Sequence, residues 1–347
     1  MSNLIIKNYY NNLDLTKKYK MASFDLDYTL IKTKSGNIFP KNKNDWLLLN
    51  DQIKPKLLEL SNDLEYIIII FSNQKGLNKF KLSVKDFEDK IDNIKKLLDV
   101  DFIFLAALDD DNYRKPRTGM FKYLKNELGI KINKKESFYV GDMAGRENDK
   151  YDTDLKFALN LKIKFMTPEE YFLDYSNEEK RLTGYKLDNI SKNTKINIKS
   201  KGKNMIIISG YPGSGKSHLA RKFENEYTIL SRDILQKNFC KKLEEEMINN
   251  NNVVIEGLYV DNNSRKELKN LASKYDYNTT YILVKTSYEL AYHLNLFRSL
   301  YQNKNRVPEI VYMKYKKNFE YPIESDWNEI IEYHPHISKK INQYFLY

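Results

Sequence analysis

The chain has 347 residues, a formal net charge of +11 and a single cysteine, Cys240. Its length suits two ordinary domains, and 41% hydrophobic residues are enough to build packed cores, which argues against a disordered chain. One cysteine excludes an intrachain disulfide framework or a cysteine-rich zinc site, so we expect oxygen ligands for any metal. The longest apolar runs, such as residues 67–71, have strand length, and the start lacks a secretory signal. We therefore expect an intracellular protein with no membrane association.

The first 175 residues show short apolar runs that alternate with amphipathic stretches. Buried strands are expected at residues 22–24, 66–71, 102–107 and 138–140. Apolar residues at helical spacing predict crossover helices over residues 84–98 and 120–128. This alternation is typical of a doubly wound, mostly parallel sheet, and residues 1–175 are predicted to form one α/β domain.

Two aspartates, Asp25 and Asp27, directly follow the first buried strand in the run FDLDYTL. The carboxyl ends of parallel strands are where such a sheet places its ligand crevice. One carboxylate can attack phosphorus and form an aspartyl-phosphate while a second acid protonates the leaving oxygen, and Asp25 and Asp27 suit these roles. Taken alone, the same pattern also fits a turn with two solvated aspartates.

Further residues suited to phosphate chemistry follow in order. Ser72 and Asn73 come after the second strand and can hydrogen-bond phosphate oxygens, and Lys115 can neutralise their charge. Asp142 follows another strand. A hard cation prefers carboxylate oxygens, so Asp25, Asp27 and Asp142 are the expected Mg²⁺ ligands of this site.

Residues 176–203 lose the alternating pattern and become rich in Lys, Asn and Ser, which predicts a basic linker. Between Lys180 and Lys203 there are eight basic residues and one acid, Asp188, so this stretch carries seven of the eleven net positive charges. A basic surface attracts phosphate backbones. A solvated lysine-rich surface without a partner has the same composition.

The alternation restarts after residue 203, which predicts a second α/β domain over residues 204–347. Strands are expected at residues 205–208, 227–230, 253–255 and 281–284, with helices near Lys216, Leu235, Glu267 and Leu290. One more strand is expected at 329–333, followed by a helix that ends at Tyr347.

A glycine-rich loop, GYPGSGKS, lies between the first of these strands and a helix, which is the context that phosphate binding requires. Its backbone N–H groups and lysine can hold ATP phosphates, and its serine can ligate Mg²⁺. The expected ATP-binding residues are Gly210, Gly213, Ser214, Gly215, Lys216 and Ser217. Asp233 follows the next strand and fits either a base for an attacking hydroxyl or a helix-capping residue.

The motifs FDLDYTL, FSNQ, RKP and VGD resemble the four motifs of the haloacid dehalogenase-type phosphatases. That resemblance implies Asp25 as nucleophile and Asp27 as general acid. The intervals from Thr29 to Ser72 and from Ser72 to Lys115 leave no room for a large cap domain, so we expect an open site that admits a polymer end.

Together with VGDMAGR, FALN and TPEEYF, then GYPGSGKS, SRD and VPEIVYMKYKKNFEYP, the chain resembles the bifunctional polynucleotide kinase 3'-phosphatases of eukaryotes and some viruses. The resemblance implies a phosphatase domain followed by a P-loop kinase, with Mg²⁺ and ATP required. It implies Asp233 as the base for a 5'-hydroxyl and Arg298 as a phosphate-facing lid residue. It also implies DNA or RNA strand ends as substrates, ligase or repair proteins as partners, and a nuclear, cytoplasmic or viral setting.

The sequence departs from that family at three places. The animal enzymes carry an amino-terminal phosphopeptide-binding domain, which we do not expect here. The third strand of the second domain is followed by Glu256 and Gly257 where the family has Asp with Asn or Thr, and the segment that ends at Arg298 has fewer arginines. Two alternatives therefore stay open: an active phosphatase with a weakened or redirected kinase domain, and a noncatalytic protein that binds nucleic-acid ends.

Overall fold

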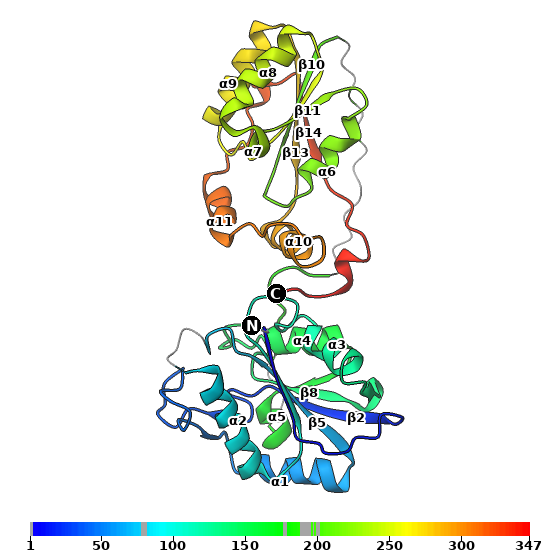
Figure 1. Ribbon diagram of the computed structural model, residues 1–347. Coiled ribbons are helices and arrows are strands. Elements are labelled where there is room, and N and C mark those ends of the chain that lie inside the picture. The colour runs from blue at the N-terminus through cyan, green and yellow to red at the C-terminus, as the bar shows by residue number, and fades with distance from the viewer. Residues whose placement is uncertain (1–2, 78–81, 176–178, 188–195, 197, 199–201) are drawn as a thin grey trace. The chain divides into compact units, whose positions relative to one another are not determined.

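The computed structural model describes residues 3–77, 82–175, 179–187, 196, 198 and 202–347 (Figure 1). Most of the expected linker, 176–203, lies outside the described residues. The chain divides into two compact units, one made of residues 1–186 with 343–347 and the other of residues 187–342. This division differs from the expected domain bounds at the C-terminal end, because residues 343–347 lie with the first unit.

The first unit is built on a mostly parallel sheet with the strand order β1-β6-β5-β2-β8-β9 (Figure 1). Strand β1 runs antiparallel to β6 at one edge, β7 pairs with β2, and the short strands β3 and β4 pair with each other. The strands expected from the sequence are confirmed, and their residues are buried on both faces, as parallel sheets require. The strands are β1 (Leu4–Asn8), β2 (Lys18–Phe24), β3 (Ile31–Lys32), β4 (Leu47–Leu48), β5 (Tyr66–Asn73), β6 (Ile103–Ala107), β7 (Lys131–Ile132), β8 (Phe138–Val140) and β9 (Lys164–Met166).

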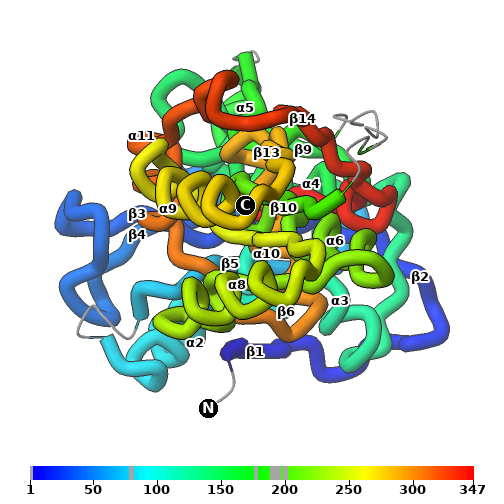
Figure 2. The backbone as a smooth tube through the Cα atoms, turned by 90° about the horizontal axis from the view of Figure 1, so that it is seen from above, coloured from blue at the N-terminus to red at the C-terminus, as the bar shows by residue number. Residues whose placement is uncertain are grey.

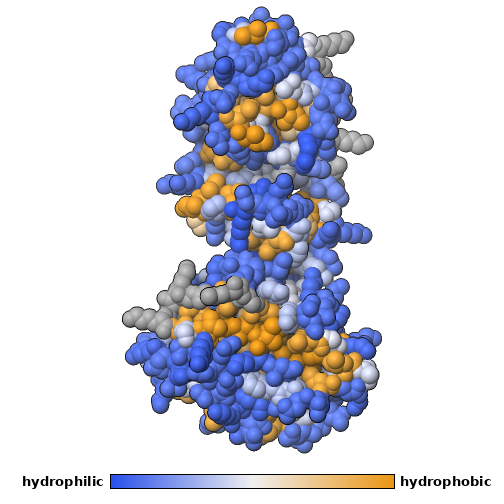
Figure 3. Space-filling model, in the orientation of Figure 1, coloured by the Kyte–Doolittle hydropathy of each residue, from blue (hydrophilic) through white to orange (hydrophobic). Residues whose placement is uncertain are grey.

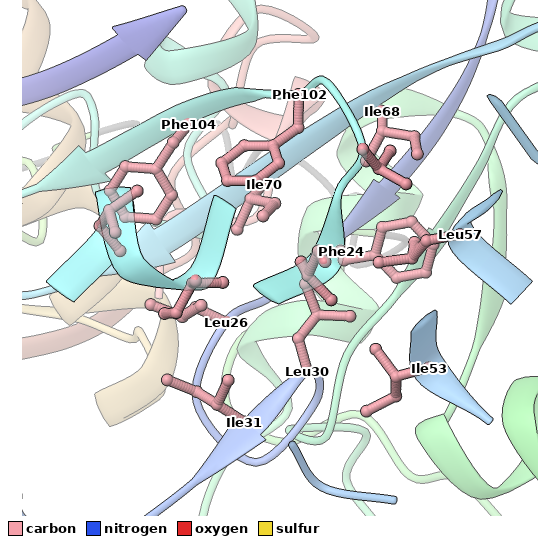
Figure 4. Close-up of a cluster of buried hydrophobic side chains, with 14 of the residues drawn as sticks. Phe24, Leu26, Leu30, Ile31, Ile53, Leu57, Ile68, Ile70, Phe102 and Phe104 are labelled. Carbon is pink, nitrogen blue, oxygen red and sulfur yellow. The ribbon is translucent and has the colours of Figure 1, made fainter. Parts of the chain in front are cut away.

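Helices cover both faces of this sheet. Residues of α1, α2 and α5 pack with Phe24 and Phe104 on one face, as Figure 4 shows for part of that core, and α3 and α4 pack with Phe71 on the other. Helix α2 begins at a capping box between Ser83 and Asp86, which satisfies its first backbone N–H groups. The helices are α1 (Ile53–Leu58), which continues as a π-helical turn (Glu59–Asp63), α2 (Val84–Leu98), α3 (Gly119–Asn126), α4 (Thr153–Leu161) and α5 (Pro168–Phe172), with a 3₁₀ turn at Lys134–Glu136.

The second unit contains a fully parallel sheet with the order β11-β12-β10-β13-β14. Its strands are β10 (Asn204–Ser209), β11 (Thr228–Ser231), β12 (Val253–Glu256), β13 (Asn278–Val284) and β14 (Glu329–Tyr333), all close to the expected positions. Helices α8 and α9 lie side by side on one face (Figures 1 and 2), and α6 covers the other. The helices are α6 (Lys216–Ala220), α7 (Arg232–Leu235), α8 (Phe239–Ile248), α9 (Asn262–Lys274), α10 (Tyr288–Tyr301) and α11 (Glu309–Asn318), with 3₁₀ turns at Arg221–Phe223, Gln236–Asn238, Glu324–Asp326 and Ile341–Gln343.

The expected helix at the C-terminal end is wrong. Only the short turn Ile341–Gln343 is helical, and the residues after it have no regular secondary structure. Phe345 and Leu346 are buried within the first unit, and their backbone groups bond to the side chains of Asn160 and Arg117 in place of a helical turn. None of the described helices is long and apolar enough to cross a membrane. Figure 3 shows a mostly polar surface that is interrupted by patches of apolar residues.

Candidate active sites

The direction of the two aspartates after β2 is set by the leucine between them. Leu26 is fully buried in the core of the first unit beside Phe24 and Leu30 (Figure 4). Because successive side chains of an extended chain point to opposite sides, Asp25 and Asp27 point away from that core. The backbone N–H of Asp25 donates to the carbonyl of Val140 at 2.9 Å, which ties the start of this loop to the end of β8.

Lys115 is the centre of a buried polar cluster. Its ammonium donates to Asp25 Oδ1, to Asp154 Oδ1 and to the Tyr139 hydroxyl, each at 2.7 Å, and its side chain is 2% exposed. Burial lowers the pKa of Lys115, but the two carboxylates raise it further, so the net pKa lies above its ordinary value. Lys115 is therefore a fixed positive charge beside Asp25.

Asn73 holds the backbone of Lys115. Its Nδ2 donates to the Lys115 carbonyl at 3.1 Å, and its Oδ1 accepts from the Lys115 N–H at 2.8 Å. These two bonds align the end of β5 with the loop that carries the lysine. Phosphate binding by Asn73 stays a prediction, and the bonds of its side chain show that it positions Lys115.

Three carboxylates converge at the carboxyl end of the sheet. Asp25, Asp142 and Asp154 each offer an oxygen within 4.8 Å of the others. Burial raises the pKa of Asp25 to about 7, although Lys115 opposes the shift, and burial together with the neighbouring carboxylates raises the pKa of Asp142 to about 9. Three carboxylates that converge in this way are a donor set that fits a hard divalent cation such as Mg²⁺.

This cluster differs from the expected metal set in one side chain, and Mg²⁺ binding by Asp27 stays a prediction. Among the described residues, the group of carboxylates contains Asp154, which the sequence analysis did not select, and it does not contain Asp27. A signal for Asp154 exists in the sequence: it lies on the apolar stripe of α4 with Phe157 and Leu161, all of them buried. A carboxylate on the core side of a helix needs a charged partner or a metal, because burying it unpaired is costly.

The glycine of the VGD motif is explained by the same residue. A Cβ at Gly141 would lie 2.6 Å from Cβ and Cγ of Asp154, closer than real Cβ atoms approach. Only glycine therefore allows Asp154 to reach the cluster. The two residues belong to one local arrangement, although they are thirteen positions apart in the chain.

Asp27 has surroundings of its own. Its Oδ2 accepts from Gln74 Nε2 at 2.6 Å, its Oδ1 lies 3.8 Å from the Lys90 ammonium, and its side chain is 43% exposed. Gln74 also donates to Ser72 Oγ at 2.9 Å, so one amide links both residues. An oriented carboxyl group that solvent and substrate can reach, two residues from a buried carboxylate, is the arrangement that proton transfer to a leaving group requires.

The glycine-rich loop of the second unit connects β10 to α6, as expected. Lys216 folds across this loop, and its ammonium donates to the carbonyls of Gly210 at 3.0 Å and Tyr211 at 2.8 Å. Burial lowers the pKa of Lys216 to about 8, although Glu256 and Asp233 oppose the shift. Gly215 has a φ of +99°, a conformation that side chains rarely adopt, and a Cβ there would meet nothing within 4 Å. The glycine is required by the path of the backbone.

A cavity of about 1130 Å³ opens over this loop within the second unit. Its walls bring together the loop, the expected base Asp233, the expected lid residue Arg298 and the carboxylate of Glu256. Glu256 ends β12, the neighbour of β10, and its Oε2 is buried without a hydrogen-bond partner among the described residues. A buried carboxylate oxygen at this position is suited to a cation or a donor that arrives with the ligand.

The Arg298 side chain is held by a neighbouring asparagine of α10. Arg298 Nε donates to Asn295 Oδ1 at 3.3 Å, and Asn295 in turn pairs with the N–H and carbonyl of Val307. Asn295 is fully buried. Its hydrogen bonds join α10 to the segment that follows and hold Arg298 Nε in place. His293 is buried and contacts the Ile341 carbonyl, which fits a packing role.

Comparisons with known proteins match both units. A family model described as polynucleotide kinase 3 phosphatase matches residues 20–172. A bifunctional polynucleotide phosphatase/kinase of Schizosaccharomyces pombe is 37% identical over 90% of this chain and 78% of the relative. A protein of Acanthamoeba polyphaga mimivirus named for the same two activities is 35% identical over 92% of this chain and 86% of the relative. A polynucleotide 3'-phosphatase of Saccharomyces mikatae is 32% identical over 46% of this chain and 87% of the relative.

Proposed function

Because this chain belongs to the bifunctional polynucleotide phosphatase/kinase family, we propose that it is an enzyme that heals broken nucleic-acid strand ends. It hydrolyses a 3'-phosphate to a hydroxyl and transfers the γ-phosphate of ATP to a 5'-hydroxyl. The observation that carries this proposal is the match to a bifunctional relative over 90% of the chain, across two units that each contain a candidate phosphate site.

In the phosphatase, Asp25 attacks phosphorus and forms an aspartyl-phosphate, while Asp27 gives its proton to the departing 3'-oxygen. Asp27 then takes a proton from the water that attacks this intermediate, which releases inorganic phosphate and restores Asp25. Lys115 holds Asp25 in place and offsets negative charge. Asp25, Asp142 and Asp154 would hold Mg²⁺, which supplies further positive charge to the phosphate oxygens.

In the kinase, the glycine-rich loop and Lys216 hold the ATP phosphates, and Ser217 would ligate the Mg²⁺ bound with them. Asp233 takes the proton of the 5'-hydroxyl as that oxygen attacks the γ-phosphorus, and ADP leaves. Arg298 lines the same cavity, where it stabilises charge on the transferred group. Glu256 keeps an acidic group at the end of β12, where the family has Asp. The departure from the family pattern therefore lengthens the side chain and preserves its negative charge.

DNA or RNA strand ends are the substrates of this proposal, and a ligase or repair protein that seals healed ends is the expected partner. A reducing setting in the nucleus or cytoplasm fits the lone Cys240, which is partly buried. The reading as a phosphatase with a weakened kinase is not favoured, because the bifunctional relatives match over nine-tenths of the chain.

The test uses one oligonucleotide with a 3'-phosphate and a 5'-hydroxyl, incubated with ATP and Mg²⁺. We expect Asp25→Asn to abolish loss of the 3'-phosphate and to leave 5'-labelling intact, and Lys216→Ala to do the reverse. A protein that binds the oligonucleotide but turns over neither end would refute the proposal. Omission of Mg²⁺ should stop both reactions.

A further inference from the structure

The residues Gln343–Tyr347, which we call the C-terminal segment, belong to the first unit although they follow the last strand of the second. Their backbone is bonded by three side chains of the first unit. Asn160 Nδ2 donates to the Phe345 carbonyl at 2.8 Å, and Asn160 Oδ1 accepts from the Phe345 N–H at 2.8 Å. Asn160 therefore pairs with Phe345 as a neighbouring strand would.

Two cations complete the contact. Arg117 Nε donates to the Leu346 carbonyl at 2.9 Å, and Lys156 Nζ donates to the Tyr347 carbonyl at 2.8 Å. The Lys156 ammonium is buried and also bonds to Asp152 and to the Thr183 carbonyl. The Phe345 and Leu346 side chains are buried in turn, so the segment is packed as part of a core.

The three side chains that bind the segment lie on α4, which carries Asp154, and on the loop that carries Lys115. Lys156 and Asn160 project from α4, and the first turn of this helix carries Asp154. Arg117 lies two residues after Lys115, and Asn160 Nδ2 also donates to the Pro116 carbonyl at 2.8 Å. One asparagine thus connects the C-terminal segment, α4 and the Lys115 loop.

We propose that the C-terminal segment is a positioning element of the phosphatase, which holds Lys115 and Asp154 at the distance that their 2.7 Å ion pair requires. The inference rests on the proposed phosphatase activity. Without the segment, Arg117 Nε loses the acceptor at Leu346 and Asn160 Oδ1 loses the donor at Phe345, and buried polar atoms that lose their partners favour a rearrangement that lets water in. The phosphatase of this chain then depends on residues that follow the kinase in sequence.

The test removes residues 343–347 and measures both activities. Because a shift of about 1 Å at a catalytic group can cost about 100-fold in rate, we expect phosphatase kcat to fall about 10- to 100-fold, with little change in KM. The fall should appear with the oligonucleotide and with p-nitrophenyl phosphate, because the cluster acts on phosphorus in both. Kinase kcat should stay within about twofold of that of the intact chain, which also shows that the second unit remains folded.

A synthetic peptide, Gln-Tyr-Phe-Leu-Tyr, tests the same contacts without relying on the folding of the truncated chain. Added to that chain, it should bind in a fluorescence anisotropy assay and restore phosphatase kcat, whereas a peptide with alanine in place of Phe and Leu should do neither. In the full chain, Asn160→Leu should lower phosphatase kcat as the truncation does. Asn126→Leu, at an exposed position on α3, is the matched control.

Two outcomes overturn the inference. One is a truncated chain whose phosphatase kcat matches that of the intact chain, and the other is a loss of kcat that the bound peptide does not restore. These outcomes differ from a failure of the proposed function, in which the intact chain itself would release no phosphate from either substrate.

Discussion

Replacing Lys115 with methionine removes the positive charge of the phosphatase cluster while it keeps the length of the side chain. The ammonium forms two ion pairs of 2.7 Å, and both partners are largely buried, with Asp154 1% and Asp25 13% exposed. Removal of one partner of a buried pair costs about 3–5 kcal/mol, because the other charge is left uncompensated. In Lys115→Met, three crowded carboxylates would remain with no cation.

For a unit of this size, about 1 kcal/mol shifts the unfolding temperature by about 2–4 °C, so we expect a fall of about 6–20 °C for the first unit. The measurement is differential scanning calorimetry in EDTA, with the transition of the second unit as an internal reference. Added Mg²⁺ should restore part of the loss, since a cation among Asp25, Asp142 and Asp154 replaces some of the missing charge. Phosphatase turnover should be lost in both conditions.

The matched control is Lys125→Met on α3, where the side chain is exposed and the change should have little effect. A first transition in EDTA that moves by less than about 2 °C in Lys115→Met would show that the ion pairs contribute little, and would refute this reasoning. Equal destabilisation in EDTA and in Mg²⁺ would show that the three carboxylates do not share a cation.

Three other perturbations test the two sites. The folded pKa values of Asp25 and Asp142, about 7 and about 9, lie above those of the unfolded chain, so the folded state binds more protons. Without divalent cations, the free energy of unfolding should therefore fall as the pH rises from about 4 to 9. Stabilisation by Mg²⁺ should grow over the same pH range, as thermal melts would measure. Gln74→Leu removes the hydrogen bond that orients Asp27, and it should slow hydrolysis of a 3'-phosphate by about tenfold or more. Hydrolysis of p-nitrophenyl phosphate should slow less, because its leaving group needs little protonation. Equal losses of rate on both substrates would contradict this prediction. Glu256→Gln should lower kinase turnover by about 10- to 100-fold and leave phosphatase turnover unchanged. Both rates can be measured on one oligonucleotide, as labelling of the 5' end and release of phosphate. Unchanged labelling would exclude Glu256 from the kinase site.

Local signals in the sequence were sufficient to predict the architecture and the position of some residues of each candidate site. Buried strands and amphipathic helices differ in the spacing of their apolar residues, which is why β5, β10 and α2 lie where the spacing predicts them. Asp25 and the glycine-rich loop stand directly after strands, so their place at the end of a parallel sheet follows from chain order alone.

The remaining partners of each site were decided by tertiary structure. Asp154 reaches the cluster because Gly141 leaves space for it, and Asn73 meets the Lys115 backbone across forty-two positions of the chain. Such pairs leave no periodic mark, since each depends on how two remote elements pack. The sequence could therefore indicate which residue types were available, but not which carboxylates would meet.

The C-terminal segment shows the same limit most clearly. The sequence predicted that these residues end a helix of the second domain, whereas Phe345 and Leu346 are buried in the first unit. Asn160, which bonds to the Phe345 backbone, lies 185 positions earlier in the chain. By itself the sequence predicted the two sheets, and it placed Asp25 and the glycine-rich loop at strand ends, through spacing and order. Only the folded chain decided which carboxylates share a site and where the last residues pack, because both depend on contacts between distant segments.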